Sequence, residues 1–358
     1  MESMEITKEF WKNRSVFITG HTGFKGGWLS LWLTEMGAQV HGYSLEAPTN
    51  PNFFTLTKLR ERIKKSTIGD INDYSLLLNS LKFAKPSIII HMAAQPLVRE
   101  SFNFPLNTFK TNIIGTVNLF EAARKIDELE AIINVTTDKC YENLEKLEPY
   151  NENDRLGGND PYSNSKACSE LVSSAYRTSF FEKKGVKLAS VRAGNVIGGG
   201  DWSNDRLIPD FFRAFDTNKN LLVRYPKAMR PWQHVLEPLS GYILLAEKLV
   251  NQGNDFAEPW NFGPDYKNAK TVSWVLSYLK EKVHSKNWKI KEIEQLKEAN
   301  ILLLDSSKAK LRLNWEPRWT LETALDKIVD WHLAYKQKIS MSDLSIDQIN
   351  SYVNQQIK

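Results

Sequence analysis

The chain has 358 residues, of which 42% are hydrophobic and 25% charged, and this is an ordinary globular composition. It argues against a disordered chain, a collagen or a coiled coil. The formal net charge of +5 is too small, and the lysines are too scattered, to predict nucleic-acid binding, although a mild positive charge suits a diphosphate substrate.

Cysteine and histidine content narrow the class of protein further. Cys140 and Cys168 are too few for a disulfide framework or a four-ligand metal site, and they fit a reducing compartment. The six histidines show no zinc spacing, which predicts no metal.

Residues 1–15 lack the apolar core of a signal peptide, and the apolar runs are too short to span a bilayer. We therefore expect a cytoplasmic protein with no membrane or nucleic-acid partner.

Short β-branched runs alternate with longer helical stretches in the first half of the chain. In chain order we expect a strand at 15–19, a helix at 24–36, a strand at 39–43, a strand ending at 67–68, a helix at 72–83, a strand at 87–91, a helix at 105–125, a strand at 131–136, a helix at 161–180 and a strand at 187–192. Such alternation predicts a parallel sheet covered by helices on both faces. Right-handed crossovers then give an α/β, doubly wound Rossmann fold.

A glycine-rich turn follows the first expected strand, with glycines at positions 20, 23 and 26. Glycine lets the backbone approach a pyrophosphate and lets the next helix pack closely on the sheet. The N-terminus of that helix offers free N–H groups to an anion. In this strand–turn–helix context the motif predicts a dinucleotide site, and a tight turn without a ligand is the alternative.

The residues after the second and third strands bear on which nicotinamide would bind. An acidic residue at the end of the second strand would hold the ribose hydroxyls of NAD, but Ser44 stands there and Glu46 follows two residues later. No arginine follows directly, as a 2′-phosphate would favour, so we expect NAD. Asp70 is placed to hold the adenine edge, although a carboxylate near a helix N-cap is an equal alternative.

The pattern loosens near residue 195, where Gly198, Gly199 and Gly200 interrupt the chain and Pro, Trp and Arg become frequent. We expect a mainly NAD-binding Rossmann domain over 1–195. A smaller, interleaved substrate domain should cover 196–340 and include a late amphipathic helix at 321–335. The polar segment 341–358 is predicted to be a peripheral tail.

Tyr162 and Lys166 stand four positions apart and so share one face of an expected helix. A neighbouring ammonium stabilises a phenolate, so we expect the pKa of Tyr162 to fall from about 10 towards working pH. Such a tyrosine can take a proton from a sugar hydroxyl while hydride leaves for nicotinamide. Thr137 and Asp138 close the fifth strand at the carboxyl edge, where such sheets bind ligands.

Several motifs together resemble the extended short-chain dehydrogenase/reductases over nearly the whole chain. They are the glycine motif, His91-Met-Ala-Ala-Gln95, Asn112-Ile-Ile-Gly-Thr-Val-Asn118, Thr137-Asp138, Tyr162 with Lys166, Arg192-Ala-Gly-Asn195, Asn261-Phe-Gly-Pro264 and Asp305-Ser-Ser-Lys308-Ala-Lys310. Within that family, the blocks at 20–28, 137–141, 198–202 and 230–237 are similar to those of the CDP-glucose 4,6-dehydratases. The resemblance implies NAD contacts from Gly20, Thr22, Gly23, Phe24, Lys25, Ser44, Asp70, Ile71, Ala93, Ala94, Gln95, Tyr162 and Lys166.

The resemblance also implies a three-step reaction, from CDP-glucose to CDP-4-keto-6-deoxyglucose and water with recycled NAD. Tyr162 would deprotonate the C4 hydroxyl as hydride leaves, water would be lost across C5 and C6, and hydride would return to C6. Many hexose dehydratases of the family carry Thr-Asp-Glu as acid and base, whereas Lys139 holds the third position here. Our hypothesis is Asp138 as acid, with Lys139 as a neutral base or as an ammonium that stabilises the enolate. A surface salt bridge is the alternative for Lys139.

Substrate and assembly contacts follow from the same resemblance. Asn195 matches a substrate contact, and Arg206 and Arg230 match positions that grip the diphosphate, for which guanidinium forks are suited; surface ion pairs are the alternative. His234, Trp202 and Trp232 are expected to shape the pocket, although core packing fits both tryptophans equally well. The helices at 105–125 and 161–180 are implied to pair across a two-fold axis, which predicts a homodimer or homotetramer. The product would serve deoxysugar synthesis for a lipopolysaccharide O-antigen.

Two other interpretations stay open. Another sugar-nucleotide 4,6-dehydratase, or a sugar-nucleotide 4-epimerase, would share the fold, but an epimerase would not need an acid–base pair after Thr137. A non-catalytic NAD-sensing protein is the other alternative, and the intact pair of Tyr162 and Lys166 argues against it.

Overall fold

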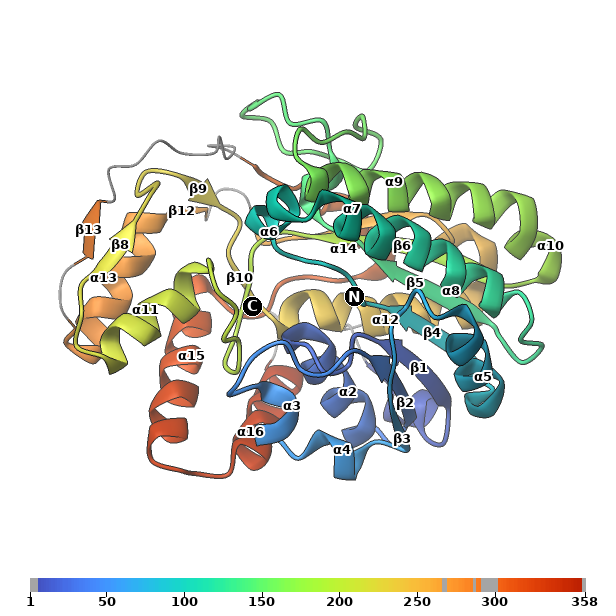
Figure 1. Cartoon of the computed structure of the whole chain (residues 1–358), viewed down its shortest axis with the longest axis horizontal. Helices are drawn as coiled ribbons and strands as arrows, with labels where there is room; N and C mark the ends of the chain where they lie inside the picture. The colour runs from blue at the N-terminus through green and yellow to red at the C-terminus, as the bar shows by residue number, and fades with distance from the viewer. Residues whose placement is uncertain (1–5, 266–268, 286–287, 291–301, 356–358) are drawn as a thin grey trace.

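The computed structural model describes residues 6–265, 269–285, 288–290 and 302–355. Its centre is a parallel seven-stranded sheet with the order β11-β6-β5-β4-β1-β2-β3 (Figure 1). The strands are β1 (Ser15–Thr19), β2 (Gln39–Ser44), β3 (Lys65–Ile68), β4 (Ile88–His91), β5 (Ala131–Val135), β6 (Lys187–Ala193) and β11 (Pro259–Phe262). The strand order reverses at β1, which creates the switch point where doubly wound sheets bind ligands. The predicted α/β doubly wound fold is confirmed.

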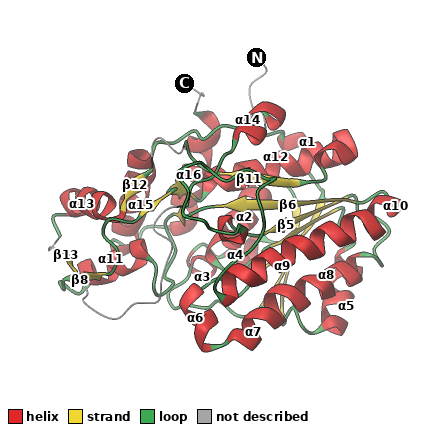
Figure 2. Cartoon of the chain, turned by 90° about the horizontal axis from the view of Figure 1, so that it is seen from above, coloured by secondary structure: helices red, strands yellow, loops and turns green. Residues whose placement is uncertain are grey.

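Helices cover both faces of this sheet. Figure 2 shows α5 (Tyr74–Ala84), α8 (Gly115–Ala123) and α9 (Pro161–Tyr176) on one side and α12 (Leu236–Gln252) on the other. Residues of α2 (Phe24–Glu35) share one hydrophobic cluster with α12, while those of α5 and α8 belong to a second cluster. The strands in the middle of the sheet are buried on both faces, as Ile88, Ile89 and Ile90 of β4 show with no exposed surface.

The two long helices predicted from the sequence each contain a π-helical turn. Residues Lys110–Ile114 form such a turn between α7 (Pro105–Phe109) and α8, and Arg177–Phe181 form another directly after α9. At the start of α9, Pro161 occupies the first turn and the Asp160 side chain accepts the Ser163 N–H at 2.9 Å. This cap fixes where α9 begins and hence where Tyr162 lies.

A smaller lobe is built from the second half of the chain and lies to the left in Figure 1. It contains α11 (Leu207–Asp216), α13 (Val272–Val283), α15 (Leu321–Lys336), β8 (Leu221–Val223) and β13 (Trp288–Ile290). Its apolar side chains, among them Phe211, Leu276 and Ile328, form a separate hydrophobic cluster. The chain also returns to the large sheet, because β11 pairs with β6. The division at residue 195 stays a prediction.

The predicted peripheral tail is the main correction to the expected fold. Residues 341–354 form α16 (Met341–Asn354), which buries Met341, Ile349 and Tyr352. The Tyr352 hydroxyl donates to Glu237 Oε2 of α12 at 2.7 Å. The prediction of a peripheral segment is therefore wrong for 341–354, because its few apolar residues share one face; residues 356–358 lie outside the described residues. None of the described helices is long and apolar enough to cross a membrane.

Candidate active site

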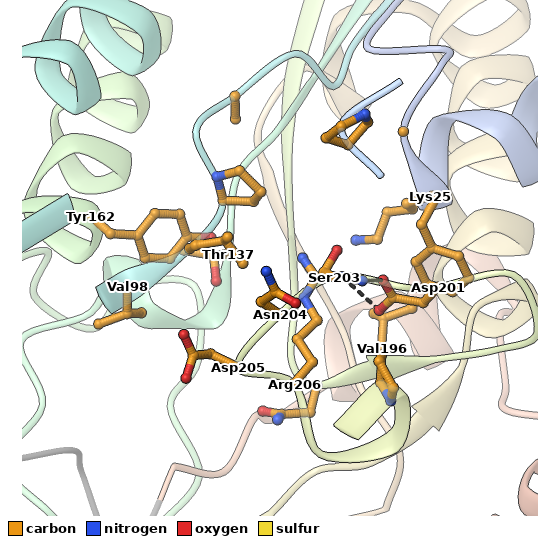
Figure 3. A pocket seen from close by; sticks show the side chains of 18 of the residues that line it. Lys25, Val98, Thr137, Tyr162, Val196, Asp201, Ser203, Asn204, Asp205 and Arg206 are labelled. Carbon is orange, nitrogen blue, oxygen red and sulfur yellow. Dashed lines mark hydrogen bonds and ion pairs between the residues drawn. The ribbon is translucent and has the colours of Figure 1, made fainter. Parts of the chain in front are cut away.

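A cleft of about 710 Å³ lies at the carboxyl edge of the sheet and takes residues from both halves of the chain. Most of the predicted site residues line it together. These are Gly20, Thr22, Gly23, Phe24, Lys25, Ser44, Asp70, Ile71, Ala93, Ala94, Thr137, Asp138, Lys139, Tyr162, Lys166, Asn195, Arg206 and Arg230. Figure 3 shows Tyr162 and Thr137 on one side of the cleft, with Lys25 and Asp201 on the other.

The glycine turn has no room for side chains. Gly20 adopts a φ of +80°, and a Cβ added to Gly26 would lie 2.1 Å from the carbonyl oxygen of Gly20. Directly after this turn, α2 begins at Phe24 with Gly23 as an N-cap that has no side chain. A helix start of this kind leaves N–H groups for an anion. The turn therefore fits the pyrophosphate of a dinucleotide.

The end of the cleft beside β2 is polar. The Thr22 hydroxyl donates to the carbonyl oxygen of Leu45 at 2.8 Å and lies 2.8 Å from the Ser44 hydroxyl, which can donate to it in turn. Glu46 also lines the cleft and brings the carboxylate that position 44 lacks. Asp70 is exposed, and its Oδ1 accepts from the Asn72 backbone N–H at 2.8 Å. That bond still leaves Asp70 a second carboxylate oxygen at the cleft.

Tyr162 and Lys166 enter the cleft from α9 and are 8% and 6% exposed. Lys166 Nζ donates to the carbonyl oxygen of Val135, 3.1 Å away, and burial lowers the pKa of Lys166 to about 8. Burial raises the pKa of Tyr162 to about 12, against the smaller opposing effects of a hydrogen bond with Thr137 and the Arg206 charge. The prediction that Lys166 lowers the Tyr162 pKa is therefore wrong for the protein without a ligand. Desolvation of the phenol outweighs the effect of the charges around it.

Asp138 follows β5 in the short 3₁₀ turn Asp138–Cys140 and is only 2% exposed. Its Oδ1 accepts from the Thr137 hydroxyl at 3.0 Å, and its Oδ2 has no hydrogen-bond partner within the described part of the chain. Burial raises the Asp138 pKa, and the neighbouring Lys139 charge opposes this only in part. A buried carboxyl that favours its protonated form can act as an acid towards a bound ligand.

Two arginines of the second half reach the same cleft. Arg206 donates to Asp201 Oδ2 at 2.8 Å, and the Asp201 side chain is only 6% exposed (Figure 3). The Arg230 charge acts on Asp138 and weakens, without reversing, the rise in the pKa of that carboxyl. Asn195 lies nearby and its carbonyl oxygen accepts the Gln233 N–H at 3.0 Å. Both guanidinium groups thus lie within the same cleft as the acid–base residues.

Two predicted site residues do not line the cleft. His234 is fully buried, with its ring 4.8 Å from that of Trp319 and 6.0 Å from that of Trp28, and burial lowers its pKa to about 3. It is a neutral core residue. The Gln95 side chain instead holds its own loop, donating to the Leu97 carbonyl oxygen at 3.1 Å.

Of the two tryptophans expected either to shape the pocket or to pack in the core, one lies at the cleft and the other packs on aromatic rings. Trp232 lines the cleft. Trp202 packs on the rings of Trp331 and Tyr335, at 5.5 and 5.4 Å.

Other residues of the cleft were missed or only partly understood from the sequence. Lys25 is half-buried, donates to the Tyr242 hydroxyl at 3.3 Å, and has its pKa lowered to about 7 mainly by desolvation. At the rim, Asp205 binds Arg99 at 2.9 Å and Arg224 at 3.4 Å. The sequence signal for Lys25 was its place in the glycine motif, whereas nothing local marked the ion pairs at Asp205.

Comparison with known proteins gives a consistent result. Residues 17–328 match the protein family described as GDP-mannose 4,6 dehydratase. A CDP-glucose 4,6-dehydratase of Salmonella typhimurium is 50% identical over 98% of this chain and 99% of its own length. A UDP-glucose 4-epimerase of Rhizobium meliloti is 25% identical over 90% of this chain and 98% of its own. Among solved structures, DesIV is a dTDP-glucose 4,6-dehydratase from Streptomyces venezuelae with NAD and TYD bound. It is 22% identical to this chain, and the match covers 90% of this chain and 98% of DesIV. The TM-score of 0.78 shows that the two proteins share a fold.

Proposed function

Since the chain belongs to the GDP-mannose 4,6-dehydratase family, within the extended short-chain dehydrogenase/reductases, we propose that it converts CDP-glucose to CDP-4-keto-6-deoxyglucose and water. The enzyme is a lyase that uses NAD and regenerates it within each turnover. The half-identical relative from Salmonella typhimurium supports cytidine as the base of the substrate.

One observation carries the choice of a dehydratase. The same cleft contains the Tyr162–Lys166 pair together with the buried acid Asp138 and the adjacent Lys139. A 4-epimerase requires only the oxidation and reduction at C4, whereas the loss of water needs a proton for the departing hydroxyl. Asp138, with a raised pKa and an oxygen that lacks a partner among the described residues, suits that role.

The cofactor contacts come from the first half of the chain. The glycine turn and the start of α2 would bind the pyrophosphate, and Ser44 with Glu46 would face the adenosine ribose. NAD, when bound, accepts hydride from C4 of the sugar and returns it to C6. Lys25 lies half-buried beside the turn and adds a positive charge that suits the diphosphate when it is protonated.

The chain's own residues move the protons. Tyr162 acts as a phenolate, which the charge on Lys166 favours, and it becomes a phenol when it takes the proton of the C4 hydroxyl. The new 4-ketone acidifies the C5 proton, which passes to Lys139 as a neutral base, or to solvent while a charged Lys139 stabilises the enolate. A proton returns to C5 from the same source when hydride returns to C6. Asp138 donates a proton to the C6 hydroxyl, which departs as water. Arg206, fixed by Asp201, and Arg230 hold the diphosphate.

An isotope experiment tests this proposal. CDP-glucose that carries deuterium at C4 should give a product with that deuterium in the C6 methyl group, read by NMR. In deuterated water, a solvent deuterium should also enter at C5. An epimerase would leave the label at C4 and would keep the C6 hydroxyl.

Assembly and location extend the proposal. Apolar side chains along the outer helices are exposed, including Leu106 (80%), Leu171 (58%) and Ile114 (49%). We propose that this surface pairs with a second copy to form a homodimer, from which a homotetramer could be built.

Both cysteines are free, which fits a reducing compartment such as the cytoplasm. A role in lipopolysaccharide O-antigen synthesis stays a prediction.

A further inference from the structure

We propose that the buried ion pair between Glu170 and Arg192 is a positioning device that holds both ends of the segment 136–141, which carries Asp138 and Lys139. The catalytic part of this inference rests on the proposed function, whereas the positioning part rests on contacts alone. Both side chains are 3% exposed, and neither lines the cleft. They therefore act on the reaction only through other residues.

The first end of the segment is attached through Glu170, which projects from α9 one turn after Lys166. Its Oε1 accepts from the Thr136 hydroxyl at 2.5 Å and from Arg192 Nε at 2.9 Å. Its Oε2 accepts from the Ser190 hydroxyl at 2.5 Å and from a second Arg192 nitrogen at 3.0 Å. Four donors thus fix the carboxylate, and Thr136 directly precedes Thr137 and Asp138.

The second end is attached through Arg192 of β6. Its remaining terminal nitrogen donates to the Tyr141 hydroxyl at 2.8 Å, and its guanidinium carbon lies 4.8 Å from the centre of the Tyr141 ring. The Tyr141 hydroxyl in turn donates to Asn261 Oδ1 of β11 at 2.7 Å. Tyr141 follows the 3₁₀ turn, so a single ion pair is attached both before and after the residues that carry the acid and the lysine.

Stability alone is a weak reason for such a pair. Removing two charges from water is unfavourable, and well-packed apolar residues of similar volume are often as stable as a buried ion pair. A carboxylate with four donors instead fixes one geometry for every group around it. Glu170 also opposes the effect of burial on Lys166, because its charge raises the pKa of that ammonium. Both catalytic pairs are therefore connected to the same carboxylate.

Glu170→Gln tests the inference, with Glu247→Gln as the matched control. Glu247 is another buried glutamate with hydrogen bonds, to Thr7 and Trp11, and it does not line the cleft. The first readout is amide hydrogen exchange, which needs no substrate. The Thr136 and Cys140 N–H groups, bonded to Val191 and Thr137 carbonyl oxygens, should exchange about tenfold faster or more in Glu170→Gln and at the wild-type rate in the control.

The second readout is turnover of CDP-glucose by the NAD-loaded enzyme. Glu170→Gln should lower kcat by about tenfold to about a hundredfold, as small displacements of catalytic groups do, with KM within about threefold of the wild type. Elimination should become the slow step, so nicotinamide in its reduced form should accumulate and be visible by absorbance. The control should match the wild type in both respects.

A double variant, Glu170→Gln with Arg192→Gln, removes both charges and covers the case in which the single variant leaves an unpaired arginine that prevents folding. Wild-type exchange and wild-type kcat in a folded variant would overturn the proposal, as would the failure of both variants to fold. If the wild type itself does not convert CDP-glucose, the proposed function fails, and the exchange comparison still decides whether the pair holds the segment.

Discussion

Lys166 Nζ donates to the carbonyl oxygen of Val135 at 3.1 Å, which joins α9 to the last residue of β5 directly before the segment that carries Asp138. Burial sets the pKa of Lys166 to about 8 and that of Tyr162 to about 12. Without a ligand, very little of the Tyr162 phenolate that could accept a proton is therefore present near neutral pH. The positive charge of bound oxidised nicotinamide should lower the Tyr162 pKa, because opposite charges nearby favour the ionised form.

This relationship predicts a cofactor-dependent titration. Tyrosinate absorbance, taken as the difference between the wild type and Tyr162→Phe, should show a pKa near 12 without NAD and a lower pKa with NAD. The alkaline limb of kcat/KM should fall as the pH rises through about 8, where Lys166 loses its charge. Tyr162→Phe should lose about 10²- to 10⁴-fold in kcat. An unchanged Tyr162 pKa on NAD binding would contradict the account.

Lys139→Ala should separate oxidation from elimination. Deuterium entry at C5 from deuterated water should slow by about 10²-fold or more, because the base or the enolate-stabilising charge is lost. The C4 oxidation, seen as reduced nicotinamide in a single turnover, should remain close to the wild-type rate. Full-rate elimination in this variant would rule out both roles for Lys139.

Gly26→Ala should abolish cofactor binding. The added Cβ would lie 2.1 Å from the Gly20 carbonyl oxygen, so the turn would have to open. NAD released from the denatured, purified protein should fall from near one per chain to near zero. Gly185→Ala is the control, because Gly185 has a φ of +75° and no heavy atom within 4 Å of an added Cβ. It should destabilise the fold by about 1–2 kcal/mol, the cost of a left-handed conformation for a residue with a Cβ, and leave NAD content unchanged.

Glu237 predicts a pH dependence of stability. Its carboxyl lies buried between α12 and α16, and burial raises its pKa from 4.5 to about 7. A folded pKa above the unfolded value gives stability that is fully present below about pH 4.5 and is lost as the pH rises through about 7. The loss should be on the order of 3 kcal/mol. Denaturant unfolding of the wild type between these pH values should show it.

Glu237→Gln should remove that part of the pH dependence, since an amide does not titrate. Glu35→Gln, a change of a partly exposed glutamate in a surface ion pair with Arg62, should keep it. The two variants should differ in the slope of unfolding free energy against pH. Equal slopes would show that Glu237 does not control the attachment of α16.

Leu171→Asp should disrupt the proposed dimer. Leu171 is 58% exposed on α9, and a charge at the centre of an apolar interface is costly to bury. Light scattering at micromolar concentration should give a dimer or tetramer for the wild type and a monomer for the variant. A monomeric wild type would reject the proposed assembly.

The sheet and most of the cleft could be predicted because their signals are local. Ile88–Ile90 form a short apolar run between turn residues, and the glycines at 20, 23 and 26 follow a strand directly. Parallel strands place their carboxyl ends at one edge, so Thr137 and Tyr162 could be assigned to the same site.

What could not be predicted depends on contacts between distant residues. His234 is buried by Trp28 and Trp319, and the Tyr352 hydroxyl donates to Glu237, which lies 115 positions earlier in the sequence. The high pKa of Tyr162 arises from burial, which no spacing of residues reveals. The Glu170–Arg192 pair likewise joins α9 to β6, which lie 22 positions apart in sequence at these residues.

A substrate panel tests the proposed activity most directly. The purified protein is incubated with CDP-glucose, dTDP-glucose, UDP-glucose or GDP-mannose, and each sugar is then followed by mass spectrometry and NMR. We expect the loss of one water and a new C6 methyl group with CDP-glucose alone. Water loss from a different nucleotide sugar would contradict the assignment of cytidine. A new epimer at unchanged mass, or no reaction with any of the four while NAD stays bound, would contradict the dehydratase itself.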